Sequence, residues 1–421
     1  MQFITNGPDI PNALLQAHEE GKVVFFCGAG ISVPAGLPSF KGLVNDIYKR
    51  LGTDKTPIER ESFERGQFDA TLDLLERRIP GQRISVRTAL AQALQPKLRR
   101  KGATDTHTAL LQLAKCRDGA LRLVTTNFDH VFEKAAQRAK QQICTYAAPM
   151  LPIPKSSRWD GLVYLHGRLS QKKNEEGELH RLVLTSGDFG IAYLTERWAA
   201  RFVSELFRNY IVCFVGYSIN DPVMRYMMDA LAADRMLGEI TPQAYAFGDC
   251  EPGQEDKKTI EWKAKGVAPI LYQVPINSFD HSALHKTLKV WAEIYRDGIL
   301  GKERIVVDYA LARPSASTPQ ENFVGRMLWA LSHESGLPAK RFAEFNPVPS
   351  LEWLTAFSEE CFQHGDLIRF GVPPHATVDA KLKFSLIRRP ASYTQTPWME
   401  LVIGWRGGGQ WDSLMGTWLG G

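Results

Sequence analysis

The sequence has few of the features that mark secreted, membrane-bound or metal-binding proteins. Its six cysteines are never closer than 28 positions apart, so no zinc-ligand spacing exists, and free thiols inside apolar runs fit a reducing compartment. The amino terminus has neither the basic start nor the apolar run of a signal peptide. No window offers the roughly 18 uncharged apolar residues of a membrane span. We therefore expect a cytoplasmic protein with no membrane partner and no zinc.

The sequence also lacks a large excess of charge of either sign. The 421 residues carry 51 Lys and Arg against 46 Asp and Glu, which gives a net charge of +5. The densest basic cluster, at 97–101, lacks the interleaved aromatic residues of a groove that binds single strands. A nucleic-acid partner is therefore not expected.

The chain does contain an alternation of short apolar runs and periodic segments. Runs that are apolar on both faces predict interior strands of a largely parallel sheet, at 22–27, 121–126, 162–166, 182–185, 210–215, 244–247 and 269–274. Periodic segments predict helices at 83–94, 128–139, 196–209, 221–232 and 279–295. This order predicts a doubly wound, Rossmann-like α/β domain, whose ligands bind at the carboxyl ends of the strands.

The composition changes after about residue 300. We assign 1–300 to the sheet domain, 301–320 to a linker and 321–421 to a smaller C-terminal α+β region. Within that region the patterns predict helices at 320–332 and 350–362 and strands at 366–388. Six of the ten tryptophans fall after residue 320, which indicates a separate core or an interaction surface. The amphipathic element that ends on two glycines favours a truncated chain, or the front part of a longer protein.

A glycine-rich turn follows the first apolar run. Gly28 and Gly30 allow backbone amides at the start of the next helix to face an anion, as in dinucleotide phosphate binding. A tight strand-to-helix turn is the alternative. The third glycine of the common dinucleotide fingerprint would fall at Val33, and the lysine of a phosphate-clamping loop is missing. A hydride-transfer dehydrogenase and a P-loop nucleotide hydrolase are both disfavoured.

Other strand ends carry polar side chains. Asn127 and Asp129 follow the second apolar run, and His166 ends the third. Each has an ordinary structural explanation, namely a helix cap, a first-turn carboxylate and a turn histidine. Their coincidence at one edge of a sheet with the glycine turn favours a pocket. Gly216 and Ser218, after the fifth run, stand where the second half of a dinucleotide would lie.

Taken in order, these motifs resemble the sirtuin family over about residues 10–300. The resemblance is closest to the bacterial sirtuin-like domains of antiphage defence proteins. It rests on five motifs, Gly28-Ala29-Gly30-Ile31-Ser32, Gly36-x-Pro38-x-Phe40, Thr125-Thr126-Asn127-Phe128-Asp129, Leu165-His166-Gly167 and Gly216-Tyr217-Ser218.

The resemblance implies that NAD is the substrate and lies across the carboxyl edge of the sheet. Asn127 would hold the nicotinamide ribose or the attacking water, Asp129 the carboxamide, and His166 would be the base, a role that suits a histidine of ordinary pKa near ~6.5. The expected binding residues are Gly28, Ala29, Gly30 and Ser32 near the phosphates and ribose, Pro38 and Phe40 over the nicotinamide, and Gly216 and Ser218 beside the adenosine.

Two departures from the usual sirtuin sequence indicate which branch of the family this chain resembles. Only 13 residues separate Gly167 from Arg181, and none is a cysteine, whereas the family's protein deacetylases carry a four-cysteine zinc module there. The family's Asp-Phe-Arg is Ser39-Phe40-Lys41 here, which keeps the aromatic residue and changes both charged neighbours.

We therefore expect an NAD glycohydrolase that releases ADP-ribose and nicotinamide and depletes NAD in antiphage defence. Its control would come from homo-oligomerisation, or from a regulatory partner or phage-derived trigger acting through the C-terminal region. Two alternatives stay open. One is an NAD-dependent protein deacylase or ADP-ribosyltransferase. The other is a noncatalytic module that binds NAD or ADP-ribose, although such a module needs neither Asn127 nor His166.

Overall fold

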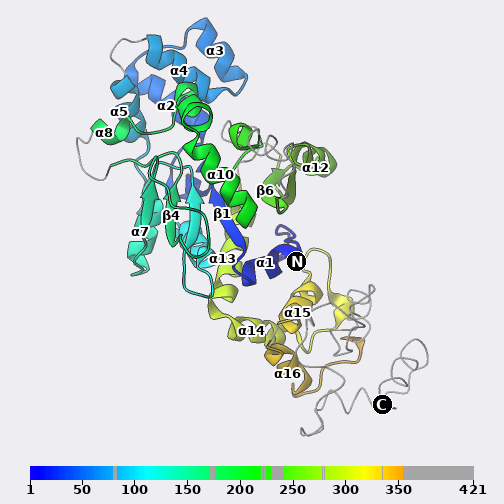
Figure 1. Ribbon diagram of the computed structural model, residues 1–421. Helices are drawn as coiled ribbons and strands as arrows, with labels where there is room; N and C mark the ends of the chain where they lie inside the picture. Colours follow the sequence, from blue (N-terminus) through cyan, green and yellow to red (C-terminus); the bar gives the residue numbers. More distant parts are fainter. Residues whose placement is uncertain are drawn as a thin grey trace. The chain divides into compact units, whose positions relative to one another are not determined.

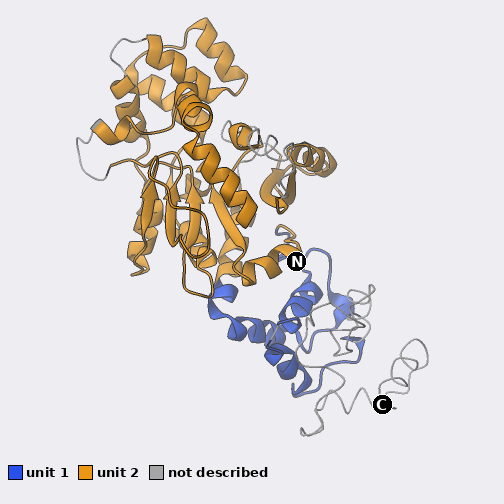
Figure 2. Cartoon of the chain, viewed as in Figure 1, with its two compact units in different colours: residues 1–7, 293–421 blue, residues 8–292 orange. Residues whose placement is uncertain are grey.

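A computed structural model describes residues 1–356, apart from 79–82, 171–175, 220, 222–223, 229–240, 277, 279, 334 and 354–355 (Figure 1). The chain forms two compact units, which are considered separately. One consists of residues 8–292 and the other of residues 1–7 and 293–421 (Figure 2).

The larger unit is built on a seven-stranded sheet, in the order β3-β4-β2-β1-β5-β6-β7. Every neighbouring pair of strands runs parallel, which confirms the predicted α/β class. The strands are β1 (Val23–Cys27), β2 (Arg122–Thr125), β3 (Thr145–Ala147), β4 (Gly161–Tyr164), β5 (Ile211–Val215), β6 (Ala244–Cys250) and β7 (Val267–Gln273).

Strand β1 lies at the centre, with Phe25 opposite Leu123 of β2 on one side and Cys213 of β5 on the other. After β1 the chain builds β2, β3 and β4 on one side and then crosses to add β5, β6 and β7 on the other. The direction of winding therefore reverses between β1 and β5. In such sheets the reversal opens a crevice at the carboxyl ends of the strands, where ligands bind.

Helices cover both faces of this sheet. Phe26 of β1 joins a buried cluster with Phe202 and Leu206 of α10, whereas the ring of Phe25 meets His18 of α1 and Trp291 of α13 on the opposite face. The helices of this unit are α1 (Asn12–Glu19), η1 (Ala29–Ala35), α2 (Phe40–Leu51), α3 (Pro57–Glu64), α4 (Phe68–Arg78), α5 (Arg83–Ala93), α6 (Asp105–Ala114), α7 (Val131–Arg138), α8 (Glu176–Leu179), α9 (Ser186–Phe189), η2 (Gly190–Thr195), α10 (Trp198–Asn209), α12 (Glu255–Ala264) and α13 (Ser282–Asp297), which belongs to this unit as far as Ala292.

A small helical layer lies beyond one end of the sheet, where α2, α3, α4, α5 and α8 gather (Figure 1). It has its own apolar core, which includes Val44, Ile47, Leu72 and Leu90, all fully buried. Apart from α8, the layer is inserted between β1 and β2 in the sequence, and η1 connects it to β1. It is therefore attached at the carboxyl end of β1, beside the crevice.

One predicted strand is wrong. Residues 182–185 form an irregular segment, because side chains and a distant carbonyl bind its backbone in place of neighbouring strands. The carbonyl of Leu182 accepts from Arg87, the amide of Val183 donates to the carbonyl of His166, and the amide of Leu184 donates to Asp188. The apolar residues of this segment fill a core rather than a sheet. Conversely, the sequence analysis does not predict β3, because three residues are too few to show a periodic pattern.

The smaller unit has a helical, aromatic-rich core in its described part. Its helices are α14 (Ile299–Tyr309), η3 (Pro314–Ala316), α15 (Phe323–Leu331) and α16 (Leu337–Ala343). Trp329 meets Phe3 edge to face, and the indole of Trp353 donates to the carbonyl of Ala310 at 3.0 Å. These two tryptophans are buried in this core. The other four that follow residue 320, and the strands predicted at 366–388, lie outside the described residues.

The division between the units falls at 292/293 rather than near 300. Much of α14 lies in the segment that the sequence assigned to a linker, because Ile305 and Val306 are buried in the smaller unit. Among the described residues, no helix has both the length and the apolar character needed to cross a bilayer.

Candidate active site

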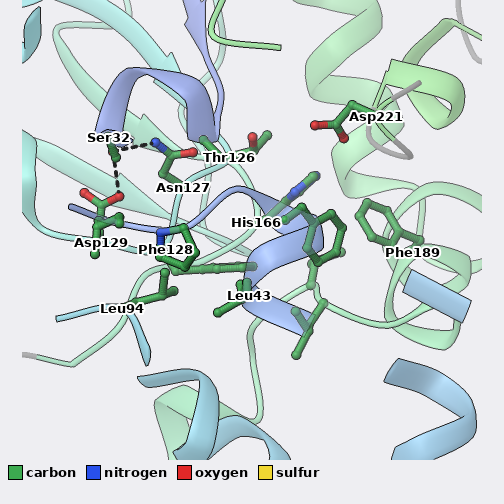
Figure 3. Close-up of a pocket in the computed structure, with 16 residues that line it drawn as sticks. Ser32, Leu43, Leu94, Thr126, Asn127, Phe128, Asp129, His166, Phe189 and Asp221 are labelled. Carbon is green, nitrogen blue, oxygen red and sulfur yellow. Dashed lines mark hydrogen bonds between the residues drawn. The ribbon is translucent and has the colours of Figure 1, made fainter. Parts of the chain in front are cut away.

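A pocket opens where the carboxyl ends of β1, β2, β4 and β5 meet the helical layer (Figure 3). It encloses about 620 Å³ of space, part of it open to solvent, a size that suits a small-molecule ligand. It is lined by Ala29, Ser32, Leu37, Pro38, Phe40, Leu43, Leu94, Thr126, Asn127, Phe128, Asp129, His166, Val183, Leu184, Phe189 and Asp221.

The structure brings together all three of the predicted catalytic side chains. Asn127, Asp129 and His166 line the same pocket, beside four of the expected binding residues, Ala29, Ser32, Pro38 and Phe40. The other four, Gly28, Gly30, Gly216 and Ser218, are not among its lining residues.

The glycines bring two backbone segments into close contact. The amide of Gly28 donates to the carbonyl of Val215, and that of Gly30 donates to the carbonyl of Gly216, both at 2.9 Å. A Cβ on Gly28 would lie 2.8 Å from the Gly216 oxygen, and one on Gly216 (φ +74°) would lie 2.7 Å from the amide nitrogen of Ile31. The amides of Gly28 and Gly30 thus bind the last residue of β5 and the turn that follows it, rather than facing an anion.

Ser32 connects two of the catalytic candidates. Its hydroxyl donates to the Asp129 carboxylate at 3.0 Å and accepts from the Asn127 amide at 3.2 Å (Figure 3). Asn127 is also held by the carbonyl of Gly28, which accepts from its Nδ2 at 3.1 Å. All three side chains are buried. The glycine turn and the end of β2 therefore form one hydrogen-bonded unit on one side of the pocket.

Asp129 is a buried carboxylate at the start of α7. Its Oδ1 accepts from the amide of Val131 at 2.9 Å, so the carboxylate lies at the amino-terminal end of the helix, where the helix dipole favours a negative charge. Burial nevertheless raises the pKa of the Asp129 carboxyl above its usual range, and the hydrogen bond from Ser32 opposes that rise.

His166 lies deep in the pocket, with only 1% of its surface exposed. Its Nε2 lies 3.0 Å from the hydroxyl of Tyr193, and its ring meets that of Phe189 edge to face at 5.1 Å. Burial lowers the pKa of His166 to about 3. The expectation of an ordinary pKa is therefore wrong for this state, because a neutral imidazole is strongly favoured in these surroundings.

A buried arginine holds part of the wall of the pocket. Arg87 of α5 is fully buried and binds Asp188 at 2.5 Å and Glu76 at 3.0 Å. It also donates to the carbonyls of Leu179 and Leu182. These contacts fix both ends of the irregular segment that presents Val183 and Leu184 to the pocket.

Several residues at the site carry no sequence signal that identifies them. Tyr193 and His107 contact the predicted residues from helices that belong to none of the five motifs. Asp221, the first residue of the helix that the sequence predicts at 221–232, also lines the pocket. Within the described part of the chain, no group of three or more His, Cys, Asp or Glu side chains is placed to hold a metal ion.

The comparisons with known proteins agree with this geometry. Residues 121–270 match the family model described as "SIR2-like domain". An uncharacterized protein of Sinorhizobium fredii, y4cA, is 32% identical over 337 residues, which is 79% of this chain and 27% of the relative. The chain thus spans about a quarter of that relative's length. The predicted sirtuin-like character is confirmed.

Proposed function

For this member of the sirtuin-like proteins, identified by its SIR2-like domain, we propose an NAD glycohydrolase activity. The bond between the nicotinamide nitrogen and C1′ of the ribose breaks, and water adds to C1′. NAD⁺ and water thereby give ADP-ribose, nicotinamide and a proton. The observation that carries the proposal is the convergence of Asn127, Asp129 and His166 on one largely apolar pocket.

The pocket suits the departure of nicotinamide. This bond breaks through an oxocarbenium-like transition state, as in glycosides. Asp129 accepts from the carboxamide NH₂ and orients the leaving group, while Phe40, Leu43 and Phe189 exclude bulk water from the reacting carbon. The negative charge of Asp129 also favours the cationic ring of the bound substrate.

The pocket also suits capture of the ribose by water. The amide nitrogen of Asn127 donates to Gly28 and Ser32, and its carbonyl oxygen points away from Ser32 (Figure 3). That oxygen is the acceptor for the water or for a ribose hydroxyl. An oxocarbenium ion is electrophilic enough to accept neutral water, so His166 is required to orient the water and not to store its proton. A neutral, weakly basic imidazole is sufficient for this role.

We further propose that the activity serves antiphage defence by depleting cytoplasmic NAD. The basis is the resemblance of the five motifs to sirtuin-like defence proteins. Such an activity has to be restrained until infection. Homo-oligomerisation, or a partner or phage-derived trigger acting through residues 321–421, would provide that control.

Chromatography of the purified chain incubated with NAD tests the activity, with and without lysate from phage-infected cells and with His166→Ala as control. We expect equimolar nicotinamide and ADP-ribose. Nicotinamide without equimolar ADP-ribose, or conversion of an added acetylated peptide, would instead indicate transfer or deacylation. NAD that binds but stays intact under every condition would indicate a binding module.

A further inference from the structure

A fully buried histidine lies behind Ser32. His107 belongs to α6, and its Nε2 lies 3.2 Å from the Ser32 hydroxyl oxygen. His107 is not among the residues that line the pocket, whereas Ser32 is. Ser32 therefore separates this histidine from the space where a ligand would bind.

The hydrogen bonds of Ser32 determine which ring nitrogen of His107 carries the proton. A serine hydroxyl has one donor and two acceptor sites. The donor is used by Asp129, because an ionised carboxylate can only accept, and one acceptor site is used by the Asn127 amide. The contact with His107 must therefore be a donation from Nε2–H to the serine oxygen. All three sites of the hydroxyl are then filled, and its orientation is unique.

The rest of the imidazole makes no comparable contact. Its Nδ1 is buried without a hydrogen-bond partner, and its ring packs edge to face on Phe132 at 4.7 Å. Burial, together with nearby His285, lowers the pKa of His107 to about 3 and keeps the ring neutral. An unpaired buried nitrogen is destabilising, and an apolar side chain would avoid that loss. The distinctive contribution of this histidine is thus its single N–H, which points at Ser32.

We propose that His107 is a positioning residue for the nicotinamide end of the pocket. By donating Nε2–H to Ser32, it directs the serine O–H toward the Asp129 carboxylate and one serine lone pair toward the Asn127 amide. Both side chains then keep the orientations that carboxamide binding and water capture require. This inference rests on the proposed function.

Kinetics of two variants at position 107 test the proposal. Glutamine can place an amide Nε2–H where the imidazole Nε2–H lies, and leucine cannot. We expect His107→Leu to lower kcat/KM for NAD about tenfold, and His107→Gln to restore most of it. His285→Gln is the matched control. It removes a half-buried histidine whose Nδ1 lies 2.9 Å from the Thr106 hydroxyl, and it should leave kcat/KM within about twofold.

A double-mutant cycle separates positioning from a structural contribution. In a Ser32→Ala background, His107→Leu should change kcat/KM by less than about twofold, since the residue acts through the missing hydroxyl. Equal losses for His107→Leu and His107→Gln in the wild-type background would overturn the proposal. So would a tenfold loss that persists without Ser32.

The tautomer of His107 provides a readout that does not depend on NAD cleavage. In ¹⁵N-histidine-labelled protein, two-bond ¹H–¹⁵N correlations assigned with His107→Gln should show a neutral ring protonated at Nε2. That pattern should change in Ser32→Ala. A proton at Nδ1 would mean that Ser32 donates to His107, and the proposal would fail. An Nε2 proton in a protein that leaves NAD intact would count against the glycohydrolase activity alone.

Discussion

The hydroxyl of Tyr193 lies 3.0 Å from Nε2 of His166, and the two rings meet at 75°. Tyr193 belongs to η2, a π-helical turn, and both residues are buried. Burial raises the pKa of the Tyr193 phenol far above its usual range, so it keeps its proton. The histidine of the site is thus held by a phenol from a segment outside the sequence motifs. Single-turn π-helical segments occur frequently at functional sites.

Removal of this hydroxyl should impair catalysis more than folding. Tyr193→Phe keeps the ring and its packing but frees the His166 imidazole to rotate. We expect kcat for NAD to fall about fivefold, which corresponds to about 1 kcal/mol for one hydrogen bond. Tyr210→Phe is the control, because the Tyr210 hydroxyl is buried without a hydrogen-bond partner and lies outside the pocket. Equal rates for Tyr193→Phe and wild type would show that the phenol does not position His166.

Removal of either polar group opposite the leaving nicotinamide should abolish NAD cleavage. We expect Asn127→Ala and His166→Ala each to lower the rate at least about 100-fold, because each deletes a group that orients the acceptor. Both side chains lie at a pocket, so the fold should survive. Circular dichroism and thermal unfolding check this, and chromatography of NAD and its products measures the rate. Wild-type consumption by either variant would contradict the assigned roles.

The sequence was most informative at the strand ends. Asn127 and His166 were recognisable because each follows a short apolar run directly, and parallel strands bring their carboxyl ends to one edge. The same reasoning failed for Leu182 to Thr185, since an apolar run does not show whether its backbone will bind another strand or the side chains of Arg87 and Asp188.

The supporting residues could not be found in this way. Tyr193 is 27 positions from His166, and His107 is 75 positions from Ser32. Their contacts depend on how η2 and α6 pack against the sheet, which no local periodicity encodes. The glycine turn shows a related limit, because Gly28 fits both a phosphate loop and a close backbone contact. Only the geometry around Gly216 shows that Gly28 makes a close backbone contact.

The buried histidines should make stability depend on pH. Burial lowers the pKa of His107 and of His166 to about 3, whereas an unfolded histidine has a pKa near ~6.5. Between these values the unfolded chain binds protons that the folded chain does not. Stability is therefore complete above about pH 6.5 and falls as the pH drops below it, by about 1.4 kcal/mol per pH unit for each histidine.

Thermal unfolding between pH 7.5 and 5.5 measures this effect. The melting temperature should fall with pH, and His107→Gln and His166→Gln should each make the fall less steep. His180→Gln, at an exposed position, should keep the wild-type slope. A melting temperature independent of pH over this range would show that these imidazoles bind protons as readily in the folded protein as in the unfolded chain.

The charges of the pocket predict which pyridine ring it accepts. Asp129 and Asp221 both line it, and none of its lining residues in the described part of the chain is Lys or Arg. A nicotinate carboxylate would be desolvated there beside another carboxylate, without a cation to pair it. We expect kcat/KM for deamido-NAD to be at least about 100-fold below that for NAD, since mismatched buried polar groups discriminate strongly.

Asp129→Asn should reduce the ratio of kcat/KM for NAD to kcat/KM for deamido-NAD by about tenfold or more, because an asparagine NH₂ can donate to the nicotinate carboxylate. Asp221→Asn is the matched control, since it removes the same charge from a different part of the pocket (Figure 3). If Asp221→Asn narrowed the ratio and Asp129→Asn did not, the carboxamide would lie beside Asp221, and Asp129 would serve only to hold Ser32.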